Sequence, residues 1–288
     1  MNDKIFEPAL DSGEPLAAQV KKVLLLKILT NTLRPGERLS ENELSVSLGV
    51  SRQPVRDALI RLAEAGLVRA LPQRGTEVTR IAVHSVYRGR FLREAVEVAV
   101  IREAAVRAEP SMIEAMDRII EAQEVAVAKK DNLSFLALDD NLHRTFATSI
   151  GHAEVWRTLQ NTKFHMDRVR YLSLPDATLE ELLIEQHQAI VEALKAHNPD
   201  GAEVAVRQHL AELLLSLPLL LRNFPDYFEG SLGPIVIIPT NRNKSLADLA
   251  IIVRTLRRTT LRINRLKGVV TDLPQPEICI PTFDAVMR

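Results

Sequence analysis

The chain has 288 residues, of which 46% are hydrophobic and 26% charged, so it is long enough for two domains and ordinary for a soluble globular protein. Its single cysteine, Cys279, excludes an intrachain disulfide framework and disfavours thiolate metal sites, while a net charge of zero does not by itself indicate a nucleic-acid partner. Because we find no signal-peptide pattern and no apolar run near the roughly 18 residues of a membrane span, we expect a cytoplasmic protein.

The N-terminal part begins with a polar segment, residues 1–15, which we expect to be a flexible leader. Apolar residues at helical spacing then predict a first helix over Leu16–Leu33, which Arg34-Pro35-Gly36 ends. A second, short helix is predicted after a capping box, in which Ser40 is the N-cap and Glu43 follows three residues later. Gly49 marks the end of this helix.

A third helix is predicted from the N-cap Ser51 to Ala65, and Gly66 ends it. Two β-prone stretches, Leu67–Leu71 and Thr76–Ile81, then flank a turn and indicate a hairpin. Two helices, a tight turn, a helix and a hairpin follow one another in a winged helix-turn-helix, so we predict a DNA-binding domain over residues 16–82.

The third helix would be the recognition helix of this domain. Its first turn carries long hydrogen-bond donors that suit base edges and phosphates in the major groove, and the hairpin tip suits the minor groove. For any single arginine, a solvated surface charge is the competing interpretation. The predicted contacts are Arg52, Gln53, Arg56, Arg74 and Gly75, whereas Val55, Leu59 and Leu62 are predicted to face the domain core.

Residues 86–225 show only helical periodicity, with breaks that predict about six helices in an antiparallel, all-α bundle. The fold class is therefore mainly α, with a winged helix followed by a helical bundle. Residues 226–288 form a C-terminal extension of unknown role, in which Ile235–Ile238 is a candidate strand and Leu246–Leu266 a candidate helix.

The bundle carries a candidate set of metal ligands. Asp139 and His143 lie four residues apart and share one helix face, while His187 and His209 lie in two helical segments separated by a turn. If those segments are antiparallel neighbours, one carboxylate and three imidazoles converge, which suits Zn, Ni, Mn or Fe(II), with zinc favoured. Hydrogen-bonded core histidines are the competing interpretation, and Asp140 is an alternative carboxylate.

The N-terminal segment resembles the DNA-binding signature of the GntR family of transcriptional regulators nearly end to end. The resemblance implies a homodimer on a short palindromic operator, with Ser51 added to the DNA contacts. Asn42 departs from the family pattern, in which an arginine is common, and this departure puts one DNA contact in doubt. The matching pieces are Pro35-Gly36, Leu39-Ser40-Glu41, Leu44, Gly49-Val50-Ser51-Arg52, Pro54-Val55-Arg56, Ala58-Leu59, Leu62, Gly66-Leu67-Val68 and Arg74-Gly75.

The bundle resembles the FCD ligand-sensing domain found in the FadR-like branch of the same family. The resemblance implies that Asp139 and the three histidines bind a divalent metal that helps to hold a small carboxylate effector. Leu142 departs from the pattern, in which an aromatic residue is common. The matching pieces are Arg93-Glu94-Ala95-Val96-Glu97, Asp139-x-x-x-His143, Glu185-x-His187-x-x-Ile190 with Ala193-Leu194, and Arg207-x-His209-Leu210.

An anionic effector, such as a small organic or sugar acid, requires donors besides the metal. Arg93 is the first candidate, and a salt bridge to Glu97 at i+4 is its alternative role. Arg168 and Arg170 follow as further candidates, and a solvated or interface role is the alternative for both.

These features predict a metabolite-responsive transcriptional regulator that is not an enzyme, and repression is the usual mode in this family. A metalloenzyme built on the bundle is one alternative, but the sequence offers no obvious general base. An architectural DNA-binding dimer without an effector is the other alternative.

Overall fold

The structure is a computed structural model that describes residues 13–72, 75–160, 162–174 and 180–230. The chain divides into two compact units, residues 1–237 and 238–288, and all described residues belong to the first. Most of the predicted leader, Arg74 and the candidate strand and helix of the C-terminal extension therefore lie outside the described residues.

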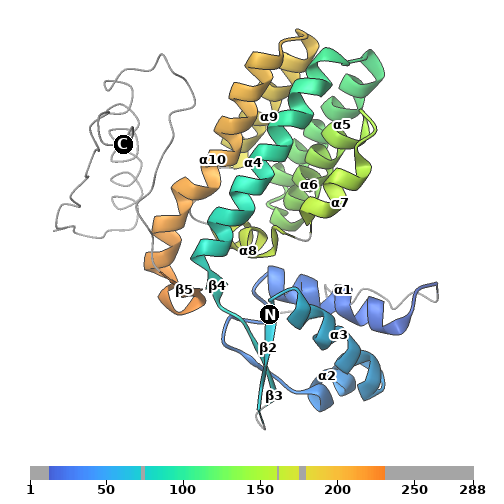
Figure 1. Cartoon of the computed structure of the whole chain (residues 1–288), viewed down its shortest axis with the longest axis vertical. Helices are drawn as coiled ribbons and strands as arrows, with labels where there is room; N and C mark the ends of the chain where they lie inside the picture. The colour runs from blue at the N-terminus through green and yellow to red at the C-terminus, as the bar shows by residue number, and fades with distance from the viewer. Residues whose placement is uncertain (1–12, 73–74, 161, 175–179, 231–288) are drawn as a thin grey trace, which may run out of the picture. The chain divides into compact units, whose positions relative to one another are not determined.

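The N-terminal part is a winged helix-turn-helix, as predicted (Figure 1). Its small sheet is antiparallel with strand order β1-β3-β2, and Leu39 pairs with Thr76 across the β1–β3 ladder. The elements are α1 Leu16–Leu29, β1 Arg38–Leu39, α2 Glu41–Leu48, α3 Arg52–Glu64, β2 Val68–Leu71 and β3 Gly75–Val78.

Two predicted boundaries in this part are wrong. Helix α1 ends at Leu29 rather than Leu33, because Asn31 takes a left-handed conformation (φ 55°) that stops helical propagation. The second wing strand ends at Val78, and Ile81 belongs to a different strand.

Local sequence accounts for the placement of the recognition helix α3. Ser40 Oγ accepts the backbone N–H of Glu43 and caps α2, and Gly49 ends α2 in a left-handed conformation (φ 64°). The apolar face of α3 then packs on α1, which leaves the first turn of α3 in solvent. As predicted, Val55, Leu59 and Leu62 are buried in this core together with Val20, Leu24 and Ile28 of α1.

The second part is an all-helical bundle, as predicted, in which α4 and α9 both pack along α10 (Figure 1). Within the described residues it has seven helices rather than six, because α7 and α8 are separated near residue 161, where no glycine or proline announces a break. The helices are α4 Val83–Val106, α5 Pro110–Ala128, α6 Asn132–Thr148, α7 Ala153–Gln160, α8 Phe164–Ser173, α9 Glu180–Lys195 and α10 Pro199–Asn223.

The segment after α10 returns to the start of the bundle. A short 3₁₀ helix, Pro225–Tyr227, leads into β5 (Phe228–Glu229), which pairs in parallel with β4 (Ile81–Ala82). Ile81 and Phe228 share a small hydrophobic core with residues of α8 and α10. This core joins the end of the wing to the bundle.

Helix α10 is, among the described helices, the one whose length and mean hydropathy (1.4) would allow it to cross a membrane. Its apolar residues instead pack on α4 and α9 in this fold, and Ala202, Val206 and Leu210 are buried in the bundle core. Because 33% of its most apolar window is buried, packing in the core accounts for part of the apolar composition of α10.

Candidate metal centre and DNA-binding surface

Four side chains from three helices meet inside the bundle. Asp139 and His143 come from α6, His187 from α9 and His209 from α10, and all four are buried. Their potential ligand atoms lie within 4.8 Å of one another. The Nε2 atoms of His143 and His209 are 3.1 Å apart, and His187 Nε2 is 3.3 Å from Asp139 Oδ1. The structure thus brings together all four residues that the sequence indicated.

A second set of residues orients the three imidazoles. The Nδ1 atom of His187 is 2.9 Å from Gln123 Oε1, and that of His209 is 3.2 Å from Gln186 Oε1. His143 Nδ1 lies 2.6 Å from a Glu97 carboxylate oxygen. These partners direct the Nε2 atoms toward the shared centre, as outer partners do in metal sites.

Sequence reasoning did not assign a role to Gln123 or Gln186. Both are amides on helices, and only the tertiary packing of α5, α9 and α10 brings them to the histidines. Glu97 was considered only as a partner of Arg93, and the structure shows that it contacts both Arg93 and His143.

The electrostatics of the centre favour an ionised carboxylate beside neutral imidazoles. Burial alone would raise the pKa of Asp139, but the Arg170 guanidinium and the neighbouring histidines hold it well below its usual range. Burial lowers the pKa of His187, and burial and the adjacent imidazoles hold that of His209 well below its usual range. This is the protonation state that binding a divalent cation requires.

Asp139 Oδ1 and His187 Nε2 are buried atoms facing the shared centre that lack a hydrogen bond of good geometry with the described residues. Unpaired buried polar atoms are costly, and a cation bound between them would satisfy both. One carboxylate and three imidazoles form a donor set for a divalent transition metal, so the residues present fit such an ion.

Asp140, the alternative carboxylate, points to a different set of charges. It binds Lys163 at 2.8 Å and Arg170 at 2.9 Å, and Lys163 also binds Asp167 at 2.8 Å. Arg170 additionally pairs with Asp139, so one guanidinium links this ion-pair network to the metal centre.

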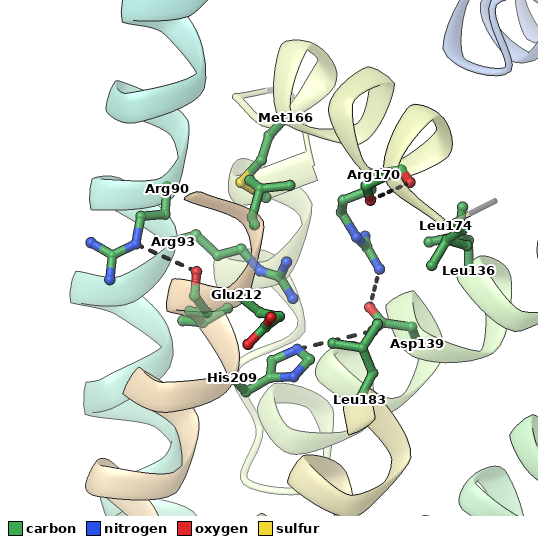
Figure 2. A pocket seen from close by; sticks show the side chains of 13 residues that line it. Arg90, Arg93, Leu136, Asp139, Met166, Arg170, Leu174, Leu183, His209 and Glu212 are labelled. Carbon is green, nitrogen blue, oxygen red and sulfur yellow. Dashed lines mark hydrogen bonds and ion pairs between the residues drawn. The ribbon is translucent and has the colours of Figure 1, made fainter. Parts of the chain in front are cut away.

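A cavity of about 40 Å³, partly open toward solvent, adjoins the centre (Figure 2). Asp139 and His209 line it together with Arg93 and Arg170, two of the three predicted effector ligands. Arg93 forms the alternative salt bridge with Glu97, yet its Nη2 atom is buried without a partner. Both roles considered for Arg93 are therefore compatible with the structure.

The third predicted effector ligand, Arg168, does not line this cavity. Its side chain is fully buried and donates one hydrogen bond, from Nη1 to the Thr79 carbonyl oxygen after the wing, while Nε and Nη2 have no partner. Burial lowers the pKa of Arg168 to about 10. The backbone carbonyl of Arg168 also accepts a bond from Asn31 after α1, so Arg168 contacts both the segment after α1 and the segment after the wing.

The predicted DNA contacts of α3 are exposed on its first turn. Arg56 binds the Glu41 carboxylate of α2 at 3.0 Å, Arg52 lies 3.9 Å from the same carboxylate, and Gln53 binds Asp57. Ser51 occupies the N-cap position without a side-chain capping bond. Gly75 begins β3 with a φ of 85°, and an added Cβ there would meet the Leu39 carbonyl oxygen at 3.3 Å. Arg74 lies outside the described residues.

Known sequence families match both parts of the chain. The bacterial regulatory proteins, gntR family, match residues 16–78, and the FCD domain matches residues 90–212. The HTH-type transcriptional repressor RspR of Escherichia coli (strain K12) is 37% identical over 77% of this chain and 97% of its own length. The probable D-xylose utilization operon transcriptional repressor of Paenarthrobacter nicotinovorans is 28% identical over 69% of this chain and 87% of its own. These relatives are transcriptional regulators by name.

Solved structures share the fold. E. coli McbR/YncC superposes with a TM-score of 0.62 at 19% identity, covering 73% of this chain and 99% of that protein. A putative GntR transcriptional regulator from Rhodococcus sp. RHA1 superposes with a TM-score of 0.57 at 24% identity, covering 69% of this chain and 97% of that protein. At these identities the likeness concerns the fold.

Proposed function

We propose, from the premise that this chain belongs to the gntR family of bacterial regulatory proteins and carries its FCD domain, that it is a cytoplasmic repressor controlled by a small carboxylate. In this proposal residues 16–82 bind DNA, residues 86–225 bind metal and effector, and a homodimer occupies a short palindromic operator. Regulators of this family bind DNA. The proposal adds the mode of control and the identity of the ligands.

The DNA contacts in the proposal are side chains on the first turn of α3 and at the tip of the wing. The exposure of the side chains on α3 supports this assignment, because a helix N-terminus entering the major groove needs long donors that are free to reach bases and phosphates. The residues are Ser51, Arg52, Gln53, Arg56, Arg74 and Gly75.

The metal centre carries the effector part of the proposal. Asp139, His143, His187 and His209 would hold one divalent ion, with zinc favoured over nickel, manganese and iron. When bound, such an ion supplies positive charge and open coordination positions for a carboxylate. The single observation that carries this assignment is the convergence of four buried ligand atoms within 4.8 Å beside a cavity lined by arginines.

Arg93 and Arg170 would bind the anionic group of the effector. Arg93 offers a buried Nη2 that has no partner, and Arg170 faces the cavity while holding Asp139. A guanidinium is the side chain best suited to a carboxylate, because its donors are planar and always charged.

Helix α8 would couple the two sites. Arg170 on this helix contacts the metal centre, and two residues earlier Arg168 contacts the segments after α1 and after the wing. A ligand that moves Arg170 would thereby bias the placement of the DNA-binding part, and by linkage DNA would alter the affinity for the ligand.

Elemental analysis of the purified full chain tests the metal assignment. We expect about one divalent ion per chain in the parent and none in a double variant, His187→Ala with His209→Ala. A matched control, His152→Ala with His197→Ala, removes two histidines outside the centre and should retain the ion. A parent that binds no Zn²⁺, Ni²⁺ or Mn²⁺ after supplementation would refute the metal site.

DNA release tests the control mechanism. Carboxylates added to the metal-loaded protein on its operator should lower its affinity for DNA, and the double variant should not respond. If no carboxylate changes DNA affinity, the protein is a DNA-binding regulator without this effector class.

A further inference from the structure

The cavity beside the candidate metal centre contains an acidic side chain that has no role in the proposed binding of the metal or of the effector carboxylate. Glu212 lies on α10, one turn after His209, and lines the same cavity as Arg93 and Arg170. Figure 2 shows Glu212 reaching into the space that Arg93 and His209 also face. A cavity built only for an anion would not place a carboxylate there, because like charges repel.

The carboxylate of Glu212 accepts few hydrogen bonds from the described residues. It accepts one hydrogen bond, from Gln186 Nε2 at 3.4 Å, and among the described residues it has no arginine, lysine or histidine within ion-pair distance. A carboxylate can accept about four hydrogen bonds, so most of its capacity faces the cavity. Partial burial also raises the pKa of Glu212, which indicates that the protein does not compensate its charge.

Glu212 shares the cavity with the groups that would bind an anion. Arg93 has an Nη2 atom without a partner among the described residues, and Arg170 pairs with Asp139, so both guanidinium groups lie beside the candidate metal centre. Two further polar residues, Arg90 and Ser173, also line the cavity, and the remaining lining residues are apolar. They are Leu136, Met166, Leu174, Leu183, Leu210 and Leu213.

We propose that Glu212 selects the effector by accepting a hydrogen bond from a hydroxyl or ammonium group on it, so that the cavity takes a monocarboxylate bearing such a donor and rejects dicarboxylates. This inference rests on the proposed effector function and narrows its ligand class. The carboxylate of the effector faces Arg93 and the metal centre, and its donor faces Glu212. A second carboxylate would instead lie against the like charge of Glu212, while Arg90, the third arginine of the cavity, is already paired with Glu94.

Calorimetric titration of matched acids into the full chain supplied with one equivalent of Zn²⁺ tests this inference. The three-carbon set is propionate, glycerate, β-alanine and malonate, and the six-carbon set is hexanoate, gluconate and glucarate. In the parent we expect the donor-bearing acid of a set to bind at least about tenfold more tightly than its unsubstituted analogue, since a site built for a donor rejects ligands that lack it. Malonate and glucarate should bind most weakly.

Two variants of Glu212 and one control sharpen the test. Glu212→Gln should raise the affinity for dicarboxylates about tenfold, because it removes the repelling charge. It should weaken a preference for an ammonium donor more than one for a hydroxyl donor, because the amide oxygen still accepts a hydrogen bond from either group but no longer offers the charge that pairs with an ammonium. This difference identifies the donor. Glu212→Asp keeps the charge and should keep dicarboxylates excluded. Glu121→Gln makes the same change on the exposed face of α5, away from the cavity, and should behave as the parent.

The two possible failures are distinguishable. If the acids bind but Glu212→Gln leaves their order unchanged, or if dicarboxylates bind the parent best, the role of Glu212 is refuted and the effector function stands. If none of these acids binds the parent, the carboxylate effector function is itself refuted, and the role of Glu212 with it. Thermal melting of each variant establishes that it is folded.

Discussion

Arg56 in the recognition helix and Arg170 in the bundle both bind carboxylates, but their surroundings differ. The Arg56 side chain is 52% exposed, and its partner Glu41 is 29% exposed. The Arg170 side chain is 13% exposed, and its partner Asp139 is 1% exposed. An exposed pair contributes little and exchanges easily for a phosphate, whereas a buried pair is fixed because neither charge tolerates isolation. The proposed DNA-contacting side chains are therefore free to exchange partners, whereas the residues of the candidate metal centre are fixed in position.

The largest expected effect is on the free energy of unfolding, when Arg170 is removed as the buried counter-charge of Asp139. Arg170→Met leaves Asp139 and Asp140 without this guanidinium, and breaking a buried pair in this way costs about 3–5 kcal/mol. Denaturant titration of the metal-free protein should show this decrease in the free energy of unfolding. A decrease below about 1 kcal/mol would mean that the network tolerates an uncompensated carboxylate.

Arg168, two residues earlier on α8, provides the matched control. It is buried without a carboxylate partner among the described residues, and two of its nitrogens are unpaired. Arg168→Met removes a costly buried charge at the expense of one hydrogen bond to Thr79, so the free energy of unfolding should change by about 1 kcal/mol or less. A loss as large as that of Arg170→Met would contradict the contrast between the two arginines.

The second effect is on operator affinity, and it should not change the properties of the bundle. Arg52→Ala with Arg56→Ala should weaken operator binding about 100-fold, since each lost base or phosphate contact costs about tenfold. The salt dependence of binding should also become shallower. The metal content and the free energy of unfolding should stay at the parental values, because both side chains are exposed. Arg61→Ala, an exposed arginine in the last turn of α3, is the control and should have little effect.

The third effect tests the residues that orient the imidazoles. Gln123→Met removes the acceptor for His187 Nδ1 while keeping the length of the side chain, and metal affinity should fall about 10- to 100-fold. Competition with a chelator measures this change. Gln188→Met alters an exposed glutamine on α9 and should leave metal affinity unchanged. Equal affinities for both variants would show that packing alone orients His187.

The comparison of the two regions also explains what the sequence could predict. Local signals specify the turns around α3, and the cap at Ser40 and the helix ends at Gly49 and Gly66 were predicted correctly, whereas the ends of α1 and of the second wing strand were not. The four residues of the candidate metal centre were found from the i, i+4 spacing of Asp139 and His143 and from two histidines on neighbouring helices. Local signals were enough for the elements, whereas the choice of these four ligands over the alternatives also depended on the resemblance to the FCD domain.

The features that the sequence did not reveal depend on packing. Gln123 is an ordinary polar residue in its helix, and only the packing of α5 on α9 brings it to His187. Glu212 likewise looks like a solvated helix charge until α10 is placed beside the cavity. The pairing of Phe228 with Ile81 joins segments 147 residues apart, and no local pattern specifies it. Arg168 was grouped with Arg170, but the helical rotation of two residues directs it elsewhere.

The smallest expected effect comes from Glu41, whose carboxylate offsets the positive charge of two arginines on the recognition helix. Glu41→Gln should release Arg56 and Arg52 from their shared carboxylate and remove a negative charge facing the DNA, so operator affinity should rise about two- to fivefold. The gain should shrink at high salt, because exposed charges are screened. Glu43→Gln changes an exposed acid on the same helix that has no ion pair among the described residues, and it should change affinity less. If Glu41→Gln instead weakens binding, Glu41 holds Arg56 in its DNA-contacting position, and the recognition surface is prearranged like the metal centre rather than adaptable.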